Sequence, residues 1–405
     1  MSPPTQSPDG PPVRVLHVNS MLIGGGTDDQ CLKLVQGLHA LGQAVWLAGP
    51  ADRDLGRRAK EARLPVLDTA AEGPLKLGFI RRCAGFIRRH KIQIIHGHHG
   101  RDIWPTIIAA RLSGRRPRIV LTRHMAKSPS SWPSRHFLLG QCDALVAVSE
   151  FTARVLREGV YEPGSSEPER RCRRPLLGDH SKIVVIHGGL DPARFQPRPA
   201  ADPAVLALRR EWGLAPEHFA FAVMGGYELP RGKGQREFLQ AAATLRDELP
   251  LARFLMVGRG SLRETLAHDI DRLGLRDCAR LAPWCDDMPV AMNATDCLVH
   301  PQVGTEAFGL VVCEAHACGR PVIASALDGV PEAFAIGGQG RLVTPESIPE
   351  LAAAMREACQ APRLNLAQRQ ALHERVAGRA SLAVLAEKSL QLYRRLLNSP
   401  PAPAP

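Results

Sequence analysis

The stretch that is most informative about the fold is Glu306-Ala-Phe-Gly-Leu-Val-Val-Cys-Glu-Ala-His-Ala-Cys-Gly-Arg-Pro321. It follows a short apolar run, 297–300, that is typical of a buried strand. Gly309 can begin a helix while leaving the backbone N–H groups of the first turn accessible. Gly319 and the proline after it then end the helix. The stretch therefore predicts a strand, a loop and a short helix in series.

Two carboxylates flank the start of this predicted helix. A helix N-terminus binds phosphate through its free N–H groups and the positive end of the helix dipole. Glu314 lies four residues after Leu310, about 5.4 Å along the same face, where a ribose attached to the phosphate would lie. Each hydrogen bond from a ribose hydroxyl to this carboxylate would contribute roughly 1.5–3 kcal/mol. Glu306 precedes the helix and would face the other end of the phosphates, where a sugar would lie.

Apolar runs alternate with helical segments in both halves of the chain, as in doubly wound α/β domains. In the first half, the predicted strands are 13–18, 44–48, 92–97, 118–122, 144–148 and 183–187. In the second half, they are 219–224, 253–257, 279–282, 297–300, 321–325 and 341–343. Because ligands of open parallel sheets bind beyond the carboxyl ends of the strands, we expect two Rossmann-like domains that face a ligand-binding cleft.

The chain of 405 residues is long enough for two domains. We expect a disordered lead-in (1–12), an N-terminal domain (13–190), a linker (191–203), a C-terminal domain (204–380), a helix (381–398) and a disordered tail (399–405). The last helix has an apolar stripe of Leu385, Leu392 and Leu396, which must pack on another element. We expect this helix to cross back to the first domain.

Residues 306–322 resemble the Glu-x7-Glu motif of the retaining glycosyltransferases of family 4, the group 1 glycosyltransferases. They match the setting Glu-x-Phe-Gly-Leu-x-x-x-Glu-Ala-x-Ala-x-Gly-x-Pro-Val almost throughout. Residues 328–332 resemble the family's following Gly-Gly-x-Pro-Glu, with Asp328 in place of the first glycine. The resemblance is strong over 205–345 and weaker over most of the remaining chain. It implies the two-domain GT-B fold and sugar transfer that is independent of metal and retains the anomeric configuration.

The resemblance also implies roles for individual residues. It implies a catalytic set of Glu306, His124 and Lys233. It implies a donor-binding set of Glu314, Arg231, Phe308, Gly309, Leu310, Gly25, Gly26 and Gly258. The family's arginine after the 219–224 strand is missing, since Gly226 or Tyr227 takes its place, and Arg231 is the nearby substitute. A solvated loop cation is the alternative interpretation of Arg231. A plain tight turn is the alternative for the loop of Gly24, Gly25 and Gly26, which follows the first predicted strand.

Several histidines lie at predicted strand ends. The resemblance implies that His124 faces the donor sugar. His96, His98 and His99 gather at another strand end, where they could bind sugar hydroxyls or serve capping and packing roles. Asp102 is not a convincing fourth metal ligand beside them. We therefore expect no metal and no cofactor, with the nucleotide sugar as a co-substrate.

The net positive charge of the chain comes entirely from its first half. Residues 1–190 hold 28 Lys and Arg against 16 Asp and Glu, whereas residues 191–405 hold 24 of each kind. In the first half, 79–89 predicts a helix with four arginines opposite an apolar face. A basic solvent-exposed surface is one interpretation of this helix, and peripheral contact with an anionic membrane is the other.

The sequence shows no apolar run near the ~18 residues of a membrane-spanning helix. Its first twelve residues lack the pattern of a secretory signal. Its ten cysteines form no Cys-x-x-Cys pair, which favours reduced thiols. We therefore expect a cytoplasmic protein, with the inner face of the cytoplasmic membrane as a further location.

Together these patterns predict transfer of a sugar from a nucleotide diphosphate sugar to a carbohydrate or glycolipid acceptor, as in the synthesis of lipopolysaccharide or another cell-envelope glycan. One alternative is a sugar-nucleotide epimerase or phosphorylase on the same fold. Another is a non-catalytic basic module that binds nucleic acid or membrane. An aromatic content of 5% and the lack of an aromatic-rich basic stripe argue against a nucleic-acid partner.

Overall fold

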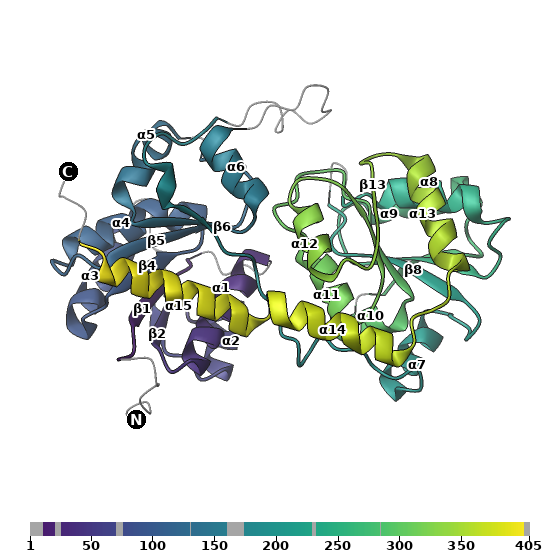
Figure 1. Ribbon diagram of the computed structural model, residues 1–405, viewed down its shortest axis with the longest axis horizontal. Coiled ribbons are helices and arrows are strands. Elements are labelled where there is room, and N and C mark those ends of the chain that lie inside the picture. The colour runs from purple at the N-terminus through teal and green to yellow at the C-terminus, as the bar shows by residue number, and fades with distance from the viewer. Residues whose placement is uncertain are drawn as a thin grey trace. The chain divides into compact units, whose positions relative to one another are not determined.

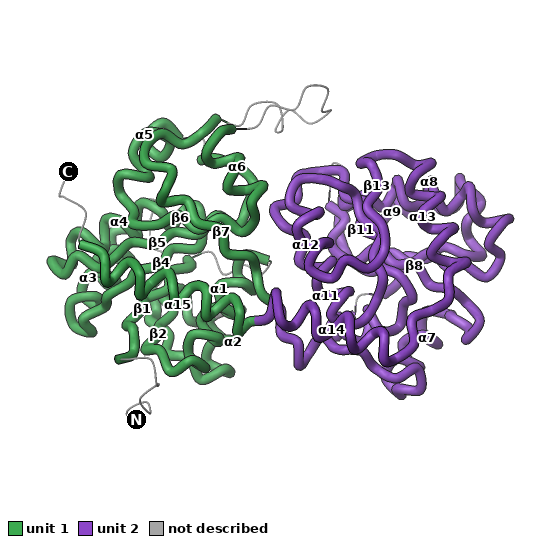
Figure 2. Tube along the Cα trace, viewed as in Figure 1, with its two compact units in different colours: residues 1–189, 382–405 green, residues 190–381 purple. Residues whose placement is uncertain are grey.

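The computed structural model describes residues 11–20, 26–69, 76–129, 131–159, 174–228, 232–283 and 285–400. The chain forms two compact units, the first of residues 1–189 and 382–405 and the second of residues 190–381 (Figure 2). Each unit is a parallel sheet covered by helices (Figure 1). The prediction of two doubly wound α/β domains is confirmed.

The first unit contains a seven-stranded parallel sheet in the order β3-β2-β1-β4-β5-β6-β7. Its strands are β1 (Arg14–Val18), β2 (Ala44–Gly49), β3 (Val66–Asp68), β4 (Ile94–Gly97), β5 (Arg118–Arg123), β6 (Ala144–Ala147) and β7 (Ile183–Val185). Its α-helices are α1 (Gly26–Ala40), α2 (Asp54–Glu61), α3 (Leu77–His90), α4 (Ile103–Leu112), α5 (Trp132–Gln141), α6 (Glu150–Glu158) and α15 (Leu382–Asn398). Two 3₁₀ turns are also present: η1 (Gly100–Asp102) precedes α4, and η2 (His180–Lys182) precedes β7. The central strands are buried on both faces, which explains their nearly continuous apolar sequence.

Helix α15 returns to the first unit and packs on α1. Gly37 of α1 permits this packing, since a Cβ on it would lie 2.8 Å from the Cβ of Ala386. In the predicted apolar stripe, Leu385 and Leu392 are buried and Leu396 is partly buried, all in the core cluster between α1, α15 and the sheet. The prediction that the last helix crosses back to the first domain is confirmed (Figure 1).

The second unit contains a six-stranded parallel sheet in the order β10-β9-β8-β11-β12-β13. Its strands are β8 (Phe219–Met224), β9 (Ala252–Val257), β10 (Ala279–Ala282), β11 (Cys297–His300), β12 (Val322–Ser325) and β13 (Gly340–Val343). Its helices are α7 (Pro203–Glu211), α8 (Gln235–Leu245), α9 (Arg263–Arg272), α10 (Met288–Ala294), α11 (Leu310–Ala317), α12 (Val330–Gly337), α13 (Ile348–Gln360) and α14 (Leu366–Ala380). All six strands predicted for this half are present, within one residue at each end.

Two features of the fold differ from the sequence-based expectations. Strand β3 was not predicted, because its three residues at the sheet edge contain no buried apolar run. Residues 191–203, expected to form a linker, belong to the second unit. They are held there because Phe195 is buried in its core and the backbone N–H of Arg198 donates to Asn293 Oδ1 at 2.9 Å.

The stretch 306–321 folds as predicted into a loop followed by α11. Gly309 is the N-cap of the helix at φ 87°, in the left-handed region that favours glycine. Gly319 lies beyond the other end at φ 69°. The N–H groups of Gly319 and Arg320 donate to the carbonyls of His316 and Ala315, which forms a Schellman motif. The helix thus begins and ends at the two predicted glycines.

Candidate active site

Lys233 and Glu306 form an ion pair at the carboxyl edge of the second sheet. The Lys233 Nζ lies 3.0 Å from the Glu306 Oε2, with side chains 35% and 19% exposed. The loop after β11 supplies Glu306, and the turn before α8 supplies Lys233. A Cβ on Gly234 would lie 1.8 Å from the carbonyl oxygen of Pro301, so only glycine lets the start of α8 approach the end of β11. This close approach brings the two predicted catalytic residues together.

The surroundings of Glu306 favour its charged form. Burial acts to raise the pKa of this carboxyl, but Lys233 and the backbone N–H of Phe308 help to hold that pKa below its ordinary value. Burial, followed by the nearby Lys233, lowers the pKa of His300 to about 4. At neutral pH the site therefore contains an ion pair beside a neutral imidazole.

Asp328 and Gly329 hold the backbone of Glu306 in place. The N–H of Glu306 donates to Asp328 Oδ2 at 3.2 Å, and the N–H of Gly329 donates to the Glu306 carbonyl, also at 3.2 Å. Asp328 has φ 51°, a conformation that aspartate tolerates better than most residues. A Cβ on Gly329 would lie 2.1 Å from the carbonyl oxygen of Ala307. The replacement of the family's first glycine by Asp328 thus supplies a hydrogen-bond acceptor for the loop that carries Glu306.

The first turn of α11 presents the features expected of a phosphate site. The N-cap residue Gly309 has no side chain with which to cap the helix, and Leu310 is partly exposed. Glu314 is partly exposed one turn later. The Phe308 side chain is 5% exposed and belongs to the core of the unit. Phe308 could therefore contact a ligand only through its backbone, and Gly309 is also buried, whereas Leu310 and Glu314 are partly exposed.

Gly258 lies in a turn that packs against the loop after β8. A Cβ on Gly258 would lie 2.1 Å from the carbonyl oxygen of Gly225. Tyr227 is fully buried, and its hydroxyl donates to the Gly258 carbonyl at 2.8 Å. Tyr227, one of the two residues that could take the place of the family's arginine, therefore joins two loops and does not point toward a ligand. Close packing alone is enough to require glycine at position 258.

At the carboxyl edge of the first sheet, the histidines form a hydrogen-bonded cluster. His17 Nδ1 lies 3.0 Å from His98 Nε2, and His98 Nδ1 lies 3.5 Å from His124 Nε2. His96 uses both ring nitrogens, with Tyr393 Oη at 2.6 Å and Thr122 Oγ1 at 2.7 Å. His17, His96 and His98 are close enough to surround a metal ion, but His96 and His98 would each have to give up a hydrogen bond to ligate it.

Burial keeps these imidazoles neutral. It lowers the pKa of His17 to about 3, and together with Arg123 it lowers the pKa of His124 to about 3. His99 is separate from the cluster, because its Nδ1 accepts the N–H of Arg101 and caps η1. His124 is thus a partly buried neutral residue at the end of β5, and His99 has the capping role that was one of its two interpretations.

The buried carboxylate of Asp102 is fully engaged in the same unit. It accepts hydrogen bonds from the backbone and hydroxyl of Ser20, and its Oδ1 lies 2.8 Å from the Nζ of Lys76. Asp102 therefore stabilises the loops around the edge and is not available as a metal ligand. Gly26, the first residue of α1, has open space where a Cβ would be. Gly25 and Arg231 lie outside the described residues.

Two family models match most of the chain. The model described as Glycosyltransferase Family 4 matches residues 24–163, and the model described as Glycosyl transferases group 1 matches residues 219–361. The chain belongs to the group 1 glycosyltransferases of family 4.

Individual relatives agree with this assignment. A phosphatidyl-myo-inositol mannosyltransferase from Mycolicibacterium smegmatis is 27% identical over 346 residues, covering 82% of this chain and 81% of that protein. A glycosyltransferase from Rickettsia africae has a TM-score of 0.80 at 19% identity, covering 96% of this chain and 100% of the other. HepE from Anabaena, solved with UDP and glucose, has a TM-score of 0.72 at 18% identity, covering 94% and 99%. The two structural likenesses show that the enzyme has the GT-B fold.

Sequence reasoning about this glycosyltransferase missed three residues beside the candidate site. His300 lies near the ion pair, whose charges influence its pKa. Its position at the end of a predicted strand could have identified it from the sequence. Asp328 was visible only as a departure from the family motif. His17 occupies the end of β1, and its register opposite His96 places it in the histidine cluster. Each of the three depends on contacts between segments far apart in the sequence.

Proposed function

We propose that this glycosyltransferase moves a sugar from a nucleotide diphosphate sugar to a hydroxyl of a carbohydrate or glycolipid, without a metal and with retention at the anomeric carbon. The observation that carries the proposal is the Lys233–Glu306 pair beside the uncapped N-terminus of α11. A cation, a helix N-terminus and a carboxylate together match the charges of a diphosphate joined to a sugar.

Each group then has a distinct role in the reaction. The N–H groups of Gly309 and Leu310 and the ammonium of Lys233 stabilise the negative charge of the departing diphosphate. Glu314 accepts hydrogen bonds from the ribose hydroxyls. Glu306 accepts hydrogen bonds from the donor sugar. Because Lys233 is already paired with Glu306, its ammonium is positioned before the donor binds, which limits the entropy lost on binding.

His124 supplies a neutral hydrogen-bonding group for the sugar from the first unit. A neutral imidazole has one donor and one acceptor nitrogen. Its link to His98 restricts which nitrogen carries the proton and therefore which one a sugar hydroxyl would meet. His124 would thus offer a sugar hydroxyl a neutral group, in contrast to the charged groups that we propose for the donor on the second unit.

The acceptor class is proposed from the relatives and from the surface of the first unit. The mycobacterial relative is named for a membrane lipid, phosphatidyl-myo-inositol, and the Anabaena structure contains UDP and glucose. A nucleotide-sugar donor and a glycolipid of the cell envelope, such as a lipopolysaccharide precursor, are the substrates that we propose for this enzyme.

Helices α3, α4 and α5 form a candidate membrane-facing surface on the first unit. They are neighbours, and Trp104 of α4 donates to Ser134 of α5 at 3.0 Å. Among the exposed large apolar side chains of the described residues, seven lie in the first unit and three in the second. Five of the seven lie on these three helices, namely Leu77, Ile108, Leu112, Trp132 and Phe137. Exposed arginines on α3 and α4 accompany them, namely Arg81, Arg82, Arg88, Arg89 and Arg111.

Apolar side chains interspersed with arginines fit the interface of an anionic bilayer, where a peripheral enzyme would meet a lipid-linked acceptor. No helix in the described part of the chain has the length and apolar character needed to cross a membrane. We therefore propose peripheral contact at the inner face of the cytoplasmic membrane.

Two experiments test the proposed function. A thermal-shift screen of nucleotide sugars should identify the donor, because a ligand at 100 times its Kd stabilises a protein by about 2.7 kcal/mol. The identified donor should then be consumed only when a glycan or glycolipid acceptor is present, apart from slow hydrolysis. Conversion of the donor into an epimer without acceptor would refute glycosyl transfer.

Membrane contact is tested by flotation with vesicles. The wild-type protein should float with vesicles that contain anionic lipid and remain unbound with zwitterionic vesicles. The double variant Arg81→Gln/Arg88→Gln should bind several-fold more weakly, since each basic residue near an anionic surface contributes about 1 kcal/mol. Equal flotation of the double variant and the wild type would refute this surface.

A further inference from the structure

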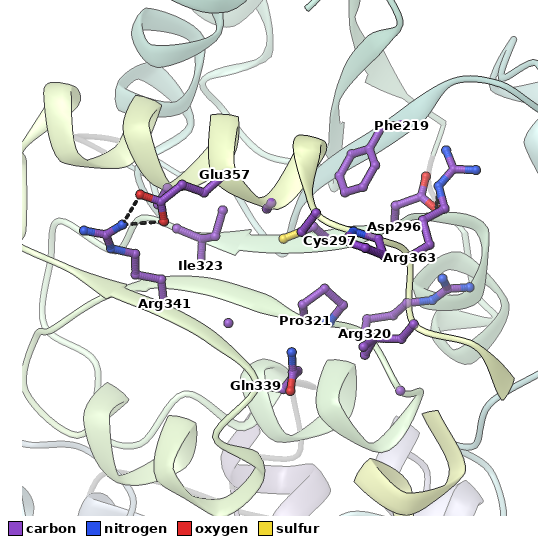
Figure 3. Close-up of a pocket in the computed structure, with 17 residues that line it drawn as sticks. Phe219, Asp296, Cys297, Arg320, Pro321, Ile323, Gln339, Arg341, Glu357 and Arg363 are labelled. Carbon is purple, nitrogen blue, oxygen red and sulfur yellow. Dashed lines mark hydrogen bonds and ion pairs between the residues drawn. The ribbon is translucent and has the colours of Figure 1, made fainter. Parts of the chain in front are cut away.

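The second unit contains a cavity of about 290 Å³ at the amino ends of its strands, close to the lower limit of roughly 300 Å³ for small-molecule sites (Figure 3). Phe219 and Cys297 are the first residues of β8 and β11, and Gly340 is the first residue of β13. The C-terminal end of α13 and the loop after it close the other side. The candidate donor site lies at the opposite edge of the same sheet, so the two sites are distinct.

The middle of the cavity is apolar. Figure 3 shows Phe219, Pro321 and Ile323 around it, with the sulfur of Cys297 between them. Small side chains of α13, including Ala358, leave the space open on the helix side. Such a lining favours a flat or compact apolar body over a string of hydroxyl groups.

The ends of the cavity are charged and not equivalent. At one end, Arg341 pairs with Glu357 and their charges cancel. At the other end, Asp296 lies 3.4 Å from Arg363 Nε and 3.7 Å from Arg209. Arg363 also donates to the carbonyls of Pro216 and His218. Figure 3 separates the two groups, with Asp296 and Arg363 at the end away from the Arg341–Glu357 pair.

Arg320 adds a further positive charge to the end with Asp296. It donates to the carbonyl of Asn293, and it has no carboxylate partner among the described residues. Its Nε is buried without a hydrogen-bond partner. Burial, followed by the nearby Arg369, lowers the pKa of the Arg320 guanidinium to about 9. The lining therefore holds three guanidinium groups and two carboxylates, with the excess positive charge at one end.

We propose that this cavity binds a small amphipathic anion, with a flat apolar body over Phe219 and Ile323 and one phosphate or carboxylate group at the Arg320–Arg363 end. The charge and the apolar lining select for both parts together, because inorganic phosphate would leave the apolar wall uncovered and a neutral aromatic would leave the positive charge unbalanced. The ligand is distinct from the donor nucleotide and from the acceptor.

The test uses 1-naphthyl phosphate as the probe, titrated into the full-length protein by calorimetry with an excess of the best nucleoside diphosphate present to occupy the donor site. We expect saturable binding with one probe per chain, and binding at least about tenfold weaker for 1-naphthol and for inorganic phosphate. Arg363→Gln should weaken probe binding at least about tenfold, because it removes one positive charge from the end of the cavity that holds the anionic group. Ala358→Phe should abolish binding by filling the cavity.

Two matched variants control for general effects of substitution. Gln360→Phe places the same ring on the exposed side of α13, and Arg276→Gln removes an exposed arginine elsewhere in the unit; both should bind within twofold of wild type. Melting temperatures of all four variants establish that they are folded. Full binding by folded Ala358→Phe, displacement of the probe by the nucleoside diphosphate, or equally tight binding of 1-naphthol would each overturn the proposal.

Discussion

The two units present different chemistry at the same edge of the same kind of sheet. In the second unit, the carboxyl edge carries the Lys233–Glu306 ion pair, and its neighbours favour the charged carboxylate. In the first unit, the equivalent edge carries neutral imidazoles, and burial keeps them neutral. The fold thus determines where ligands can be bound, whereas the side chains at the strand ends and in the following loops determine whether charged or neutral groups face the ligand.

Under the proposed function, the charged edge of the second unit would bind the diphosphate, and the neutral edge of the first unit would contribute to binding of the sugar. A diphosphate that accumulates negative charge as it leaves needs positive charge and helix N–H groups. A sugar hydroxyl or an acceptor hydroxyl carries no net charge, so a neutral imidazole such as that of His124 can bind it as well as the Glu306 carboxylate. Removing a charged side chain should therefore lower the activity most when the side chain belongs to the second unit. Lowering the pH should reduce stability most through the first unit.

The largest effect on kcat is expected for Lys233→Ala. It removes the cation that we propose stabilises the leaving diphosphate, so kcat should fall by roughly 10²–10³-fold. Lys388→Ala, at an exposed position of α15, is the matched control and should keep full activity. Steady-state turnover of the identified donor measures both. A wild-type kcat in Lys233→Ala would show that the charged edge of the second unit does not stabilise the leaving diphosphate.

Glu314→Ala should lower kcat/KM at least about 100-fold while leaving the fold intact. Two hydrogen bonds from ribose hydroxyls to a carboxylate contribute roughly 1.5–3 kcal/mol each. Glu248→Ala removes an exposed carboxylate of the same unit and should have no effect on turnover. Unchanged kcat/KM in Glu314→Ala would refute its role in ribose binding.

Acid stability tests the neutral histidines of the first unit. Burial lowers the pKa of His17 in the folded protein to about 3, against an ordinary value of 6.5. Below pH 6.5 the unfolded chain therefore binds a proton at this residue that the folded chain does not bind. Stability should therefore fall as the pH drops from about 7 toward 3, and this residue alone should account for about 2 kcal/mol between pH 7 and pH 5.

Urea unfolding at those two pH values measures the effect. His17→Asn should lose about 2 kcal/mol less than the wild type over this interval, whereas exposed His268→Asn should match the wild type. An identical pH dependence in His17→Asn and wild type would show that His17 is not held neutral by burial.

The smallest expected effect concerns the loop that holds Glu306. Asp328→Ala and Asp328→Gly both remove the acceptor for the Glu306 N–H. At φ 51° alanine is strained and glycine is not, so Asp328→Ala should be less stable than Asp328→Gly by roughly 1–2 kcal/mol. Chemical denaturation measures this difference. Equal stability of the two variants would contradict the left-handed conformation at this position.

Much of the fold could be predicted from the sequence, because buried parallel strands leave an apolar signature. All twelve predicted strands have counterparts, and the glycines at 309 and 319 marked both ends of α11. The unpredicted β3 lies at a sheet edge, where burial imposes no such pattern. The residues expected to form a linker pack on the second unit through contacts that no local pattern reveals.

The candidate site was predictable in part for the same reason. The spacing of Glu306 and Glu314 around a helix start is local and therefore visible in the sequence. The pairing of Glu306 with Lys233 spans 73 residues and depends on the close approach at Gly234. The burial of Tyr227 likewise became apparent only in the structure. Retention at the anomeric carbon, independence from metal and the cleft between the two domains stay predictions.

A crystal structure of the enzyme with its best nucleoside diphosphate tests the central claim most directly. We expect the diphosphate within hydrogen-bonding distance of the backbone N–H groups of Gly309 and Leu310, the Lys233 ammonium turned toward it, and the ribose hydroxyls on the Glu314 carboxylate. An ordered nucleotide bound elsewhere on the second unit, with the first turn of α11 in contact with solvent only, would contradict the account.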